Sequence, residues 1–99
     1  MIRHVVMFRW NDSVTEDQLA EMATALDALP GAIPAIAAYR HGADLGLAPT
    51  NFQYAITADF ASVDDFASYR DHPEHQRFIA DHITGRVAER AAVQFELAD

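Results

Sequence analysis

Between Ile2 and Trp10, apolar residues fall on both alternating sets of positions, and several of them are β-branched or aromatic. This pattern predicts a β-strand whose middle is buried on both sides. One face carries a histidine among apolar side chains and the other carries two arginines; the two sets are His4, Val6, Phe8 and Trp10, and Arg3, Val5, Met7 and Arg9.

A helix is predicted next along the chain. Residues 11–13 break the strand, and Thr15 stands three positions before Gln18, which is the spacing of a capping box. Apolar residues then recur at helical spacing over roughly four turns; they are Leu19, Met22, Leu26 and Leu29. Pro30 and Gly31 predict the end of this helix.

Two more strands are predicted in the middle of the chain. The first covers residues 36–42, and its weak pattern is typical of an edge strand. The second follows a loop that contains Pro49 and alternates clearly over residues 52–60.

The C-terminal half adds a second helical region and a last strand. Ser62 is expected to cap a helix whose inner stripe is Val63, Phe66 and Tyr69. The sequence Asp-His-Pro at 71–73 interrupts this helix, and Pro73 suits the first position of a new one that ends near Gly85. Residues 87–97 alternate again and predict the fourth strand.

The predicted order β-α-β-β-α-β is that of an α+β, ferredoxin-like fold in a single domain over residues 1–99. Both helices then cover one face of an antiparallel sheet. The other face is expected to carry small and apolar side chains with few charges, namely Val5, Met7, Ala55, Thr57 and Ala92. We therefore expect a homodimer in which two sheets face each other and form an α/β barrel.

Composition excludes several classes of function. The net charge is −8, with fifteen acidic residues against seven arginines and no lysine, which argues against nucleic acid and anionic membrane surfaces as partners. The absence of cysteine excludes disulfides and thiol chemistry. Neither a membrane-spanning run nor the pattern of a signal peptide is present, so we expect a cytoplasmic protein.

Histidines and one tyrosine are the candidates for chemistry. His75 suits the role of a general base, because the ordinary pKa of histidine lies near neutrality. His4 lies on the apolar face of its strand and needs a hydrogen-bond partner, which Tyr69 or His75 would supply. The alternative is that His4 and Tyr69 form a purely structural contact in the core.

A metal site is not expected. His72 and His75 form an H-x-x-H pair, but Pro73 starts a helix between them and spoils the geometry, and no third ligand stands at a standard spacing. We also expect no cofactor. Four arginines are candidates for guiding an anionic ligand, or else for solvated positions and ion pairs between subunits; they are Arg3, Arg9, Arg86 and Arg90.

Four segments resemble the stress-responsive A/B barrel (Dabb) family of dimeric α/β-barrel proteins: residues 2–10, 29–35, 41–47 and 69–75. The resemblance extends over nearly the whole chain, and its most specific part is His4 together with the His-Pro-x-His sequence at 72–75. It implies a ferredoxin-like subunit in a dimeric barrel, in agreement with the pattern analysis.

The resemblance also implies a chemistry. The plant polyketide cyclases of this family close a linear polyketide by an intramolecular aldol condensation without a cofactor. Their base is a histidine of the His-Pro-x-His segment, aided by a tyrosine and a first-strand histidine, and the matching positions here are His75, Tyr69 and His4. Where the cyclases carry bulky aromatic residues on the first helix, this chain has smaller ones, so a different pocket is expected, lined by Val6, Phe8, Met22, Ala23, Leu26 and Phe78.

Three functions remain open at this point. The first is a cofactor-independent enzyme or binding protein for a small aromatic or polyketide-like metabolite. The second is a non-catalytic stress-response or structural dimer, and the third is a cofactor-free monooxygenase acting on quinol-type substrates. An open cavity of at least a few hundred Å³ lined by His4, Tyr69 and His75 would favour the first over the second, and a packed interior there would favour the second.

Overall fold

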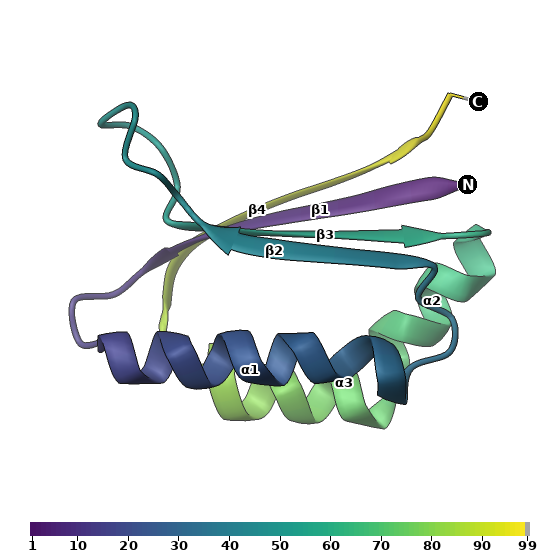
Figure 1. Cartoon of the computed structure of the whole chain (residues 1–99), viewed down its shortest axis with the longest axis horizontal. Coiled ribbons are helices and arrows are strands. Elements are labelled where there is room, and N and C mark those ends of the chain that lie inside the picture. Colours follow the sequence, from purple (N-terminus) through teal and green to yellow (C-terminus); the bar gives the residue numbers. More distant parts are fainter. Residues whose placement is uncertain (99) are drawn as a thin grey trace.

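A computed structural model describes residues 1–98 and shows a four-stranded antiparallel sheet covered by helices on one face (Figure 1). The strands lie in the order β2-β3-β1-β4. The elements are β1 (Ile2–Trp10), α1 (Glu16–Ala32), β2 (Ala38–Ala43), β3 (Tyr54–Phe60), α2 (Val63–Asp71), α3 (Pro73–Phe78), the π-helical segment η1 (Ile79–Ile83) and β4 (Val87–Glu96). This arrangement confirms the predicted ferredoxin-like α+β fold, with β2 at one edge of the sheet. No helix in the described part of the chain is long and apolar enough to cross a membrane.

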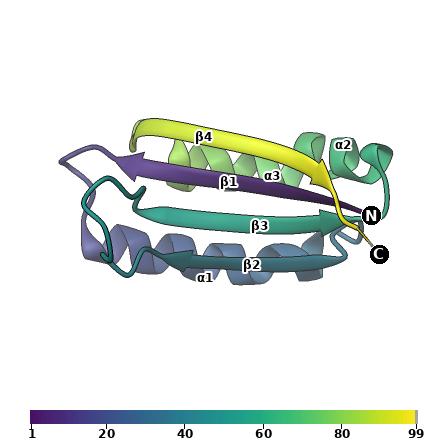
Figure 2. The same cartoon turned by 90° about the horizontal axis from the view of Figure 1, so that it is seen from above.

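The two helical units lie under different halves of the sheet. Seen from above, α1 runs beneath β2, whereas α2 and α3 lie beneath β1 and β4 (Figure 2). Every second residue of β1 points into this helical side and is buried. These residues are Ile2, His4, Val6, Phe8 and Trp10, so the set that sequence alternation placed together does share one face.

The first helix starts as predicted and ends later. The Thr15 hydroxyl accepts from the Gln18 backbone N–H, and the Gln18 side chain accepts from that of Thr15, which completes the capping box. The helix runs on to Ala32, so the prediction that Pro30 and Gly31 end it is wrong. Proline in the last turn removes a single N–H donor, and the turn is still closed by a 2.9 Å bond from the fully buried Ile33 to the Leu29 carbonyl.

The second helical region differs from expectation at one position. Ser62 caps α2 as predicted, with its hydroxyl accepting from the Asp65 N–H at 3.1 Å, and Tyr69 is buried. Val63 is 68% exposed, so its assignment to the inner stripe is wrong. Side chains on a helix lean towards the N-terminus, and that of the first residue therefore leans past the helix end.

The open face of the sheet is apolar, but Ala92 is not part of it. In the register of β1 with β4, Val6 pairs with Ala92, and antiparallel partners point to the same side, so Ala92 faces the helices and its predicted placement is wrong. Its neighbours Val93 and Phe95 take the open face and are 54% and 46% exposed.

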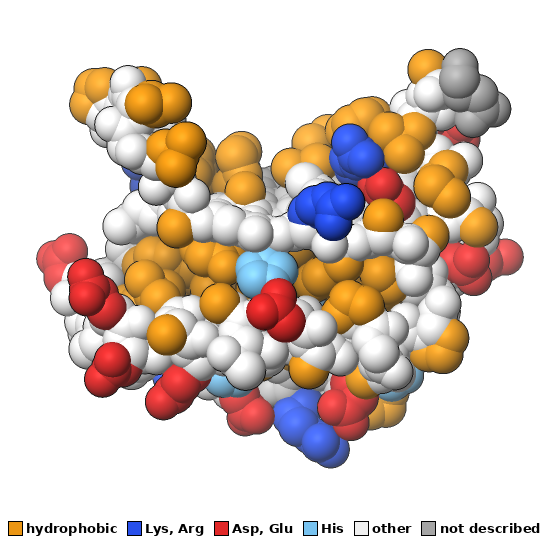
Figure 3. Space-filling view, viewed as in Figure 1, with side chains coloured by type: hydrophobic (Ala, Val, Ile, Leu, Met, Phe, Trp, Pro, Cys, Tyr) orange, Lys and Arg blue, Asp and Glu red, His pale blue; other side chains and the backbone are white. Residues whose placement is uncertain are grey.

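The loop between β2 and β3 rises beyond the open face and carries apolar side chains, while acidic side chains gather mainly along the helical layer (Figure 3). Leu45 and Leu47 of this loop are each 84% exposed. Ion pairs of Arg3 with Asp59, at 2.8 Å, and of Arg9 with Glu89, at 3.2 Å, flank the apolar area. The open face therefore combines an apolar middle with charges at its margins.

Candidate functional site

A cavity of about 270 Å³ lies between the sheet and the helices of the C-terminal half. It brings together all three side chains that the sequence singled out for chemistry, His4, Tyr69 and His75. The remaining lining residues are Val6, Phe8, Ile56, Phe66, Arg70, Phe78, Ile79, Ile83, Arg90 and Gln94. The cavity is therefore an apolar space with a few polar groups, as in typical small-molecule sites.

His75 is fixed in one tautomer by the backbone of the preceding helix. Its Nδ1 lies 3.0 Å from the carbonyl oxygen of Arg70. Because a carbonyl only accepts hydrogen bonds, Nδ1 carries the proton, and the neutral ring has its lone pair on Nε2. Burial lowers the pKa of His75 below its ordinary value, which keeps the ring neutral near pH 7.

The helix break between α2 and α3 places His75 over Tyr69. His72 occupies the cap position, where its Nδ1 accepts from the Glu74 N–H at 3.1 Å, and Pro73 takes the first position of α3. The chain turns here, and the imidazole of His75 comes to lie 4.1 Å from the ring of Tyr69, centroid to centroid. The break is therefore what makes the two rings neighbours.

Tyr69 is oriented by a second tyrosine. Its hydroxyl oxygen lies 3.2 Å from that of Tyr39 on β2, and the two phenols share one hydrogen bond. Burial raises the pKa of Tyr69 and of Tyr39 above their ordinary value, so both remain protonated at neutral pH. With Tyr39 as donor, the Tyr69 hydroxyl keeps its own proton available for a ligand.

His4 is held by the opposite strand. The amide nitrogen of Gln94 lies 2.9 Å from His4 Nδ1, and since an amide N–H donates, Nδ1 accepts and the proton of the neutral ring lies on Nε2. Burial, followed by the nearby charges of Arg90 and His75, lowers the pKa of His4 from 6.5 to about 4. His4 is therefore a neutral N–H donor, whereas His75 is a neutral acceptor.

Three of the six predicted substrate-binding residues, Val6, Phe8 and Phe78, line the cavity, and the three on α1 do not. Met22 and Leu26 are 1% and 0% exposed and belong to the core beneath the other half of the sheet. Ala23 likewise lies outside the cavity lining. The difference arises because α2, α3 and η1, rather than α1, form the floor of this space.

Gln94 and Tyr39 were missed as site residues, whereas Arg90 was named only as one of four candidates for guiding an anionic ligand. For Gln94 a signal existed, since it shares its strand face with Ala92, and placing that face towards the helices would have put it opposite His4. Arg90 follows the same alternation and pairs with Phe8. Nothing in the sequence signals Tyr39, because its bond to Tyr69 joins two elements thirty positions apart.

The structure gives no support to a metal centre among residues 1–98, where no group of three or more His, Asp or Glu side chains is suitably placed. In particular, His72 uses Nδ1 to cap α3 and is absent from the cavity lining.

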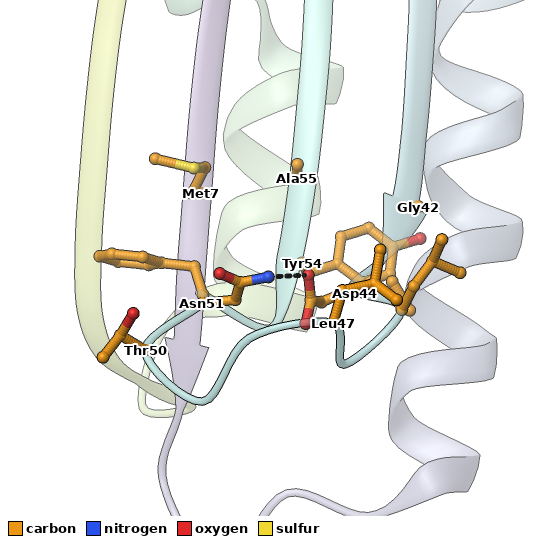
Figure 4. A pocket seen from close by; sticks show the side chains of 11 residues that line it. Met7, Gly42, Asp44, Leu47, Thr50, Asn51, Tyr54 and Ala55 are labelled. Carbon is orange, nitrogen blue, oxygen red and sulfur yellow. Dashed lines mark hydrogen bonds between the residues drawn. The ribbon is translucent and has the colours of Figure 1, made fainter.

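A second and wider hollow, of about 510 Å³, lies on the open face of the sheet (Figure 4). Met7 and Ala55 line it from the strands, and the β2–β3 loop bounds it, braced by a 3.1 Å bond from the Asn51 side chain to Asp44. No histidine lines it. Of the two spaces only the first is lined by histidines, so the cavity of His4, Tyr69 and His75 is the better candidate for acid–base chemistry.

The sequence matches the family described as Stress responsive A/B Barrel Domain over residues 2–97. The chain belongs to this family. This A/B barrel chain is also 32% identical to an uncharacterized protein of Streptomyces coelicolor over 82 residues, which cover 81% of this chain and 84% of that protein.

Solved structures show the same fold. A dimeric ferredoxin-like protein of unknown function from Thermobifida fusca is 50% identical to this A/B barrel chain, with a TM-score of 0.90 and coverage of 97% of this chain and 90% of that one. A hydroxynitrile lyase from Passiflora edulis is 20% identical, with a TM-score of 0.86 and coverage of 99% and 94%. At that identity the second likeness shows the fold alone.

Proposed function

We propose that this protein is a homodimeric, cofactor-independent enzyme that removes a proton from carbon next to a carbonyl group in a small aromatic or polyketide-like metabolite. The observation that carries the proposal is that three residues whose neutral side chains can supply a base and two donors line one apolar cavity: His75, Tyr69 and His4. A neutral base placed near hydrogen-bond donors is typical of sites for general acid–base catalysis.

Each group has a distinct role in the proposed step. His75 Nε2 takes the proton, and the electron pair of the broken C–H bond forms the enolate double bond while the carbonyl π pair moves to oxygen. The O–H of Tyr69 and the N–H of His4 then donate hydrogen bonds to that oxygen. In an aldol step the enolate oxygen re-forms its carbonyl while the π pair of the enolate forms a bond from its carbon to a second carbonyl carbon. The π pair of the second carbonyl moves to its oxygen, and this alkoxide takes the proton back from His75.

The cavity itself favours this proposal over a purely structural role for the histidines. No hydrogen bond joins His4 to Tyr69 in the described residues: His4 Nδ1 binds Gln94, and the Tyr69 hydroxyl binds Tyr39. The ring centroids of His4 and Tyr69 lie 6.3 Å apart and border open space rather than a packed interior. A ligand site needs such an open space, whereas a structural core would fill it with side chains.

The dimer is part of the proposal. Val93, Phe95, Leu45 and Leu47 expose large apolar side chains on the side of the sheet that no helix covers. A second copy packed on this face would bury them, and the Thermobifida fusca relative is dimeric. The two cavities would then lie on the outer, helical sides of the assembly.

Exchange of carbon-bound protons tests the chemistry without knowledge of the natural substrate. Benzoylacetone, an aromatic diketone, is incubated with the protein in heavy water, and loss of its methyl proton signal is followed by NMR. We expect the wild-type protein to accelerate exchange and His75→Ala to reduce the acceleration at least about a hundredfold, the usual contribution of a general base.

His72→Asn is the matched control. It removes a histidine three residues away but keeps a side chain that caps α3, so exchange should proceed as in the wild type. Exchange at the buffer rate with the wild-type protein, or equal rates with and without His75, would contradict the proposed function.

A further inference from the structure

The charged residues around the cavity are of one sign. The chain carries fifteen acidic residues and seven arginines, yet the lining includes two arginines, Arg70 and Arg90, and not one aspartate or glutamate. In a protein with a net charge of −8, a small molecule with an anionic group would be repelled from most of the surface. The charged residues that line the cavity are therefore positive, although the protein as a whole is negative.

Arg90 lies where the cavity opens at the edge strand. It pairs with Phe8 in the register of β1 with β4, so its side chain projects to the helical side, followed on the same face by Ala92 and Gln94. All three β4 residues are exposed.

The two arginines differ in their partners. Both carboxylate oxygens of Asp71 bind the guanidinium of Arg70, at 2.9 and 3.0 Å. Arg90 has no ion pair or side-chain hydrogen bond with any other residue in the described range 1–98. Its five N–H donors are available to something outside the chain.

The charge of Arg90 acts into the cavity. After burial, it is the largest cause of the lowered pKa of His4, which lies on the adjacent strand and lines the same space. A ligand group beside His4 therefore lies within the field of this guanidinium, where an anion gains energy and a cation loses it.

We propose that the ligand is a carboxylic acid whose carboxylate pairs with Arg90 at the cavity mouth while its aromatic or polyketide-like body fills the apolar interior. This inference rests on the proposed function and specifies its substrate class. A carboxylate matches the planar fork of a single guanidinium. Among residues 1–98, Arg90 is the one arginine of the cavity lining without an ion pair, because Arg70 is bound to Asp71, and the single charge of a carboxylate matches one guanidinium.

The test compares the binding of an aromatic carboxylate with that of its uncharged amide analogue. Binding of naphthoate and of naphthamide, which share one aromatic body, is measured by calorimetry for the wild type, Arg90→Gln and Arg86→Gln. Arg86 is the matched control, because it is also without an ion pair in the described residues but does not line the cavity. Its substitution changes the net charge by the same amount as that of Arg90. Arg90 is exposed and without a protein partner, so its substitution should leave the fold intact.

We expect the wild type to bind naphthoate about tenfold more tightly than naphthamide, and Arg90→Gln to abolish that preference by weakening only the acid. Arg86→Gln should keep the preference. Equal affinity for both probes in the wild type, or equal loss in the two variants, would overturn the role of Arg90 while leaving an apolar ligand site in place. Failure of both probes to bind would count against the proposed function as well.

Discussion

The imidazole of His75 lies 4.1 Å from the ring of Tyr69, although the two residues belong to different helices. Six positions in one continuous helix would place them on different sides of it, because the turn contains 3.6 residues. The cap at His72 and the turn at Pro73 bring them to the same wall of the cavity. Local helix-end chemistry thus assembles the candidate acid–base pair.

The pH dependence of proton exchange should report His75. Burial lowers its pKa, an effect opposed by the Arg70 carbonyl and Asp71 and reinforced by His72. A general base must be neutral, so exchange should be lost as the pH falls through this lowered pKa, with a midpoint below pH 6.5. Rates of benzoylacetone exchange at a series of pH values provide the measurement. A midpoint above 6.5 would assign the base to another group.

The tautomer of His4 should depend on Gln94. In Gln94→Glu a carboxylate replaces the amide donor, so it would attract a proton to Nδ1 and take it from Nε2 in the neutral ring. We expect side-chain NMR to show protonated Nδ1 in this variant and exchange to slow by about tenfold, the value of one lost hydrogen bond to a developing charge. Gln53→Glu, which adds the same charge beside Trp10 and away from the cavity, should leave both readouts unchanged.

The free energy of unfolding should decrease as the pH falls through a window set by the pKa of His4. Its pKa is about 4 in the folded protein against 6.5 in the unfolded chain, so between these values only the unfolded chain binds the proton, and acid destabilises the fold. The pKa difference allows a loss of about 3 kcal/mol, reduced to about 2 kcal/mol by solvent in the cavity. Unfolding by urea at several pH values gives the free energy of unfolding.

The variant His4→Gln should flatten that dependence without removing it, because the lowered pKa of His75 acts in the same direction. The ion-paired Asp59 and Asp71 have pKa values below 3.8, so their stabilising contribution is lost only at lower pH. A pH dependence identical in the variant and the wild type would show that His4 does not titrate as described.

The open face of the sheet should be the dimer interface. Val93→Asp places an unpaired charge in the apolar middle of this face, twice in a two-fold dimer, and should weaken the dimer about a hundredfold or more. Val63→Asp adds the same charge at a more exposed position on α2 and should leave the dimer unchanged. Light scattering distinguishes the two. A wild-type protein that is monomeric at micromolar concentration would contradict this part of the account.

Most of the fold could be predicted from hydrophobic periodicity and helix caps. The β1 alternation, the Thr15 capping box and the Ser62 cap each have local causes, and each appears in the structure where the sequence indicated. The errors have physical causes as well. Pro30 was interpreted as a helix end, although the burial of Ile33 carries the helix past it. Ala92 was assigned to the wrong face, because both faces of β4 contain small residues.

The candidate site was predictable only in part. Histidines and tyrosines are recognisable by chemistry, but which of them meet depends on strand register and on the turn at Pro73, which sequence spacing does not determine. Gln94 lies ninety positions from His4 and reaches it only through the pairing of β1 with β4. The π-helical turn that brings Ile79 and Ile83 to the cavity wall likewise has no sequence signal that periodicity would detect.

The most direct test of the central claim is side-chain NMR of the five histidines during titration with naphthoate. Ligand in the cavity should shift the signals of His4 and His75 together and saturably. The signals of His41, which is bound to Asp27 and Tyr54, and of the helix cap His72 should stay in place. Saturable binding that leaves His4 and His75 unmoved, or that moves all five alike, would contradict the account.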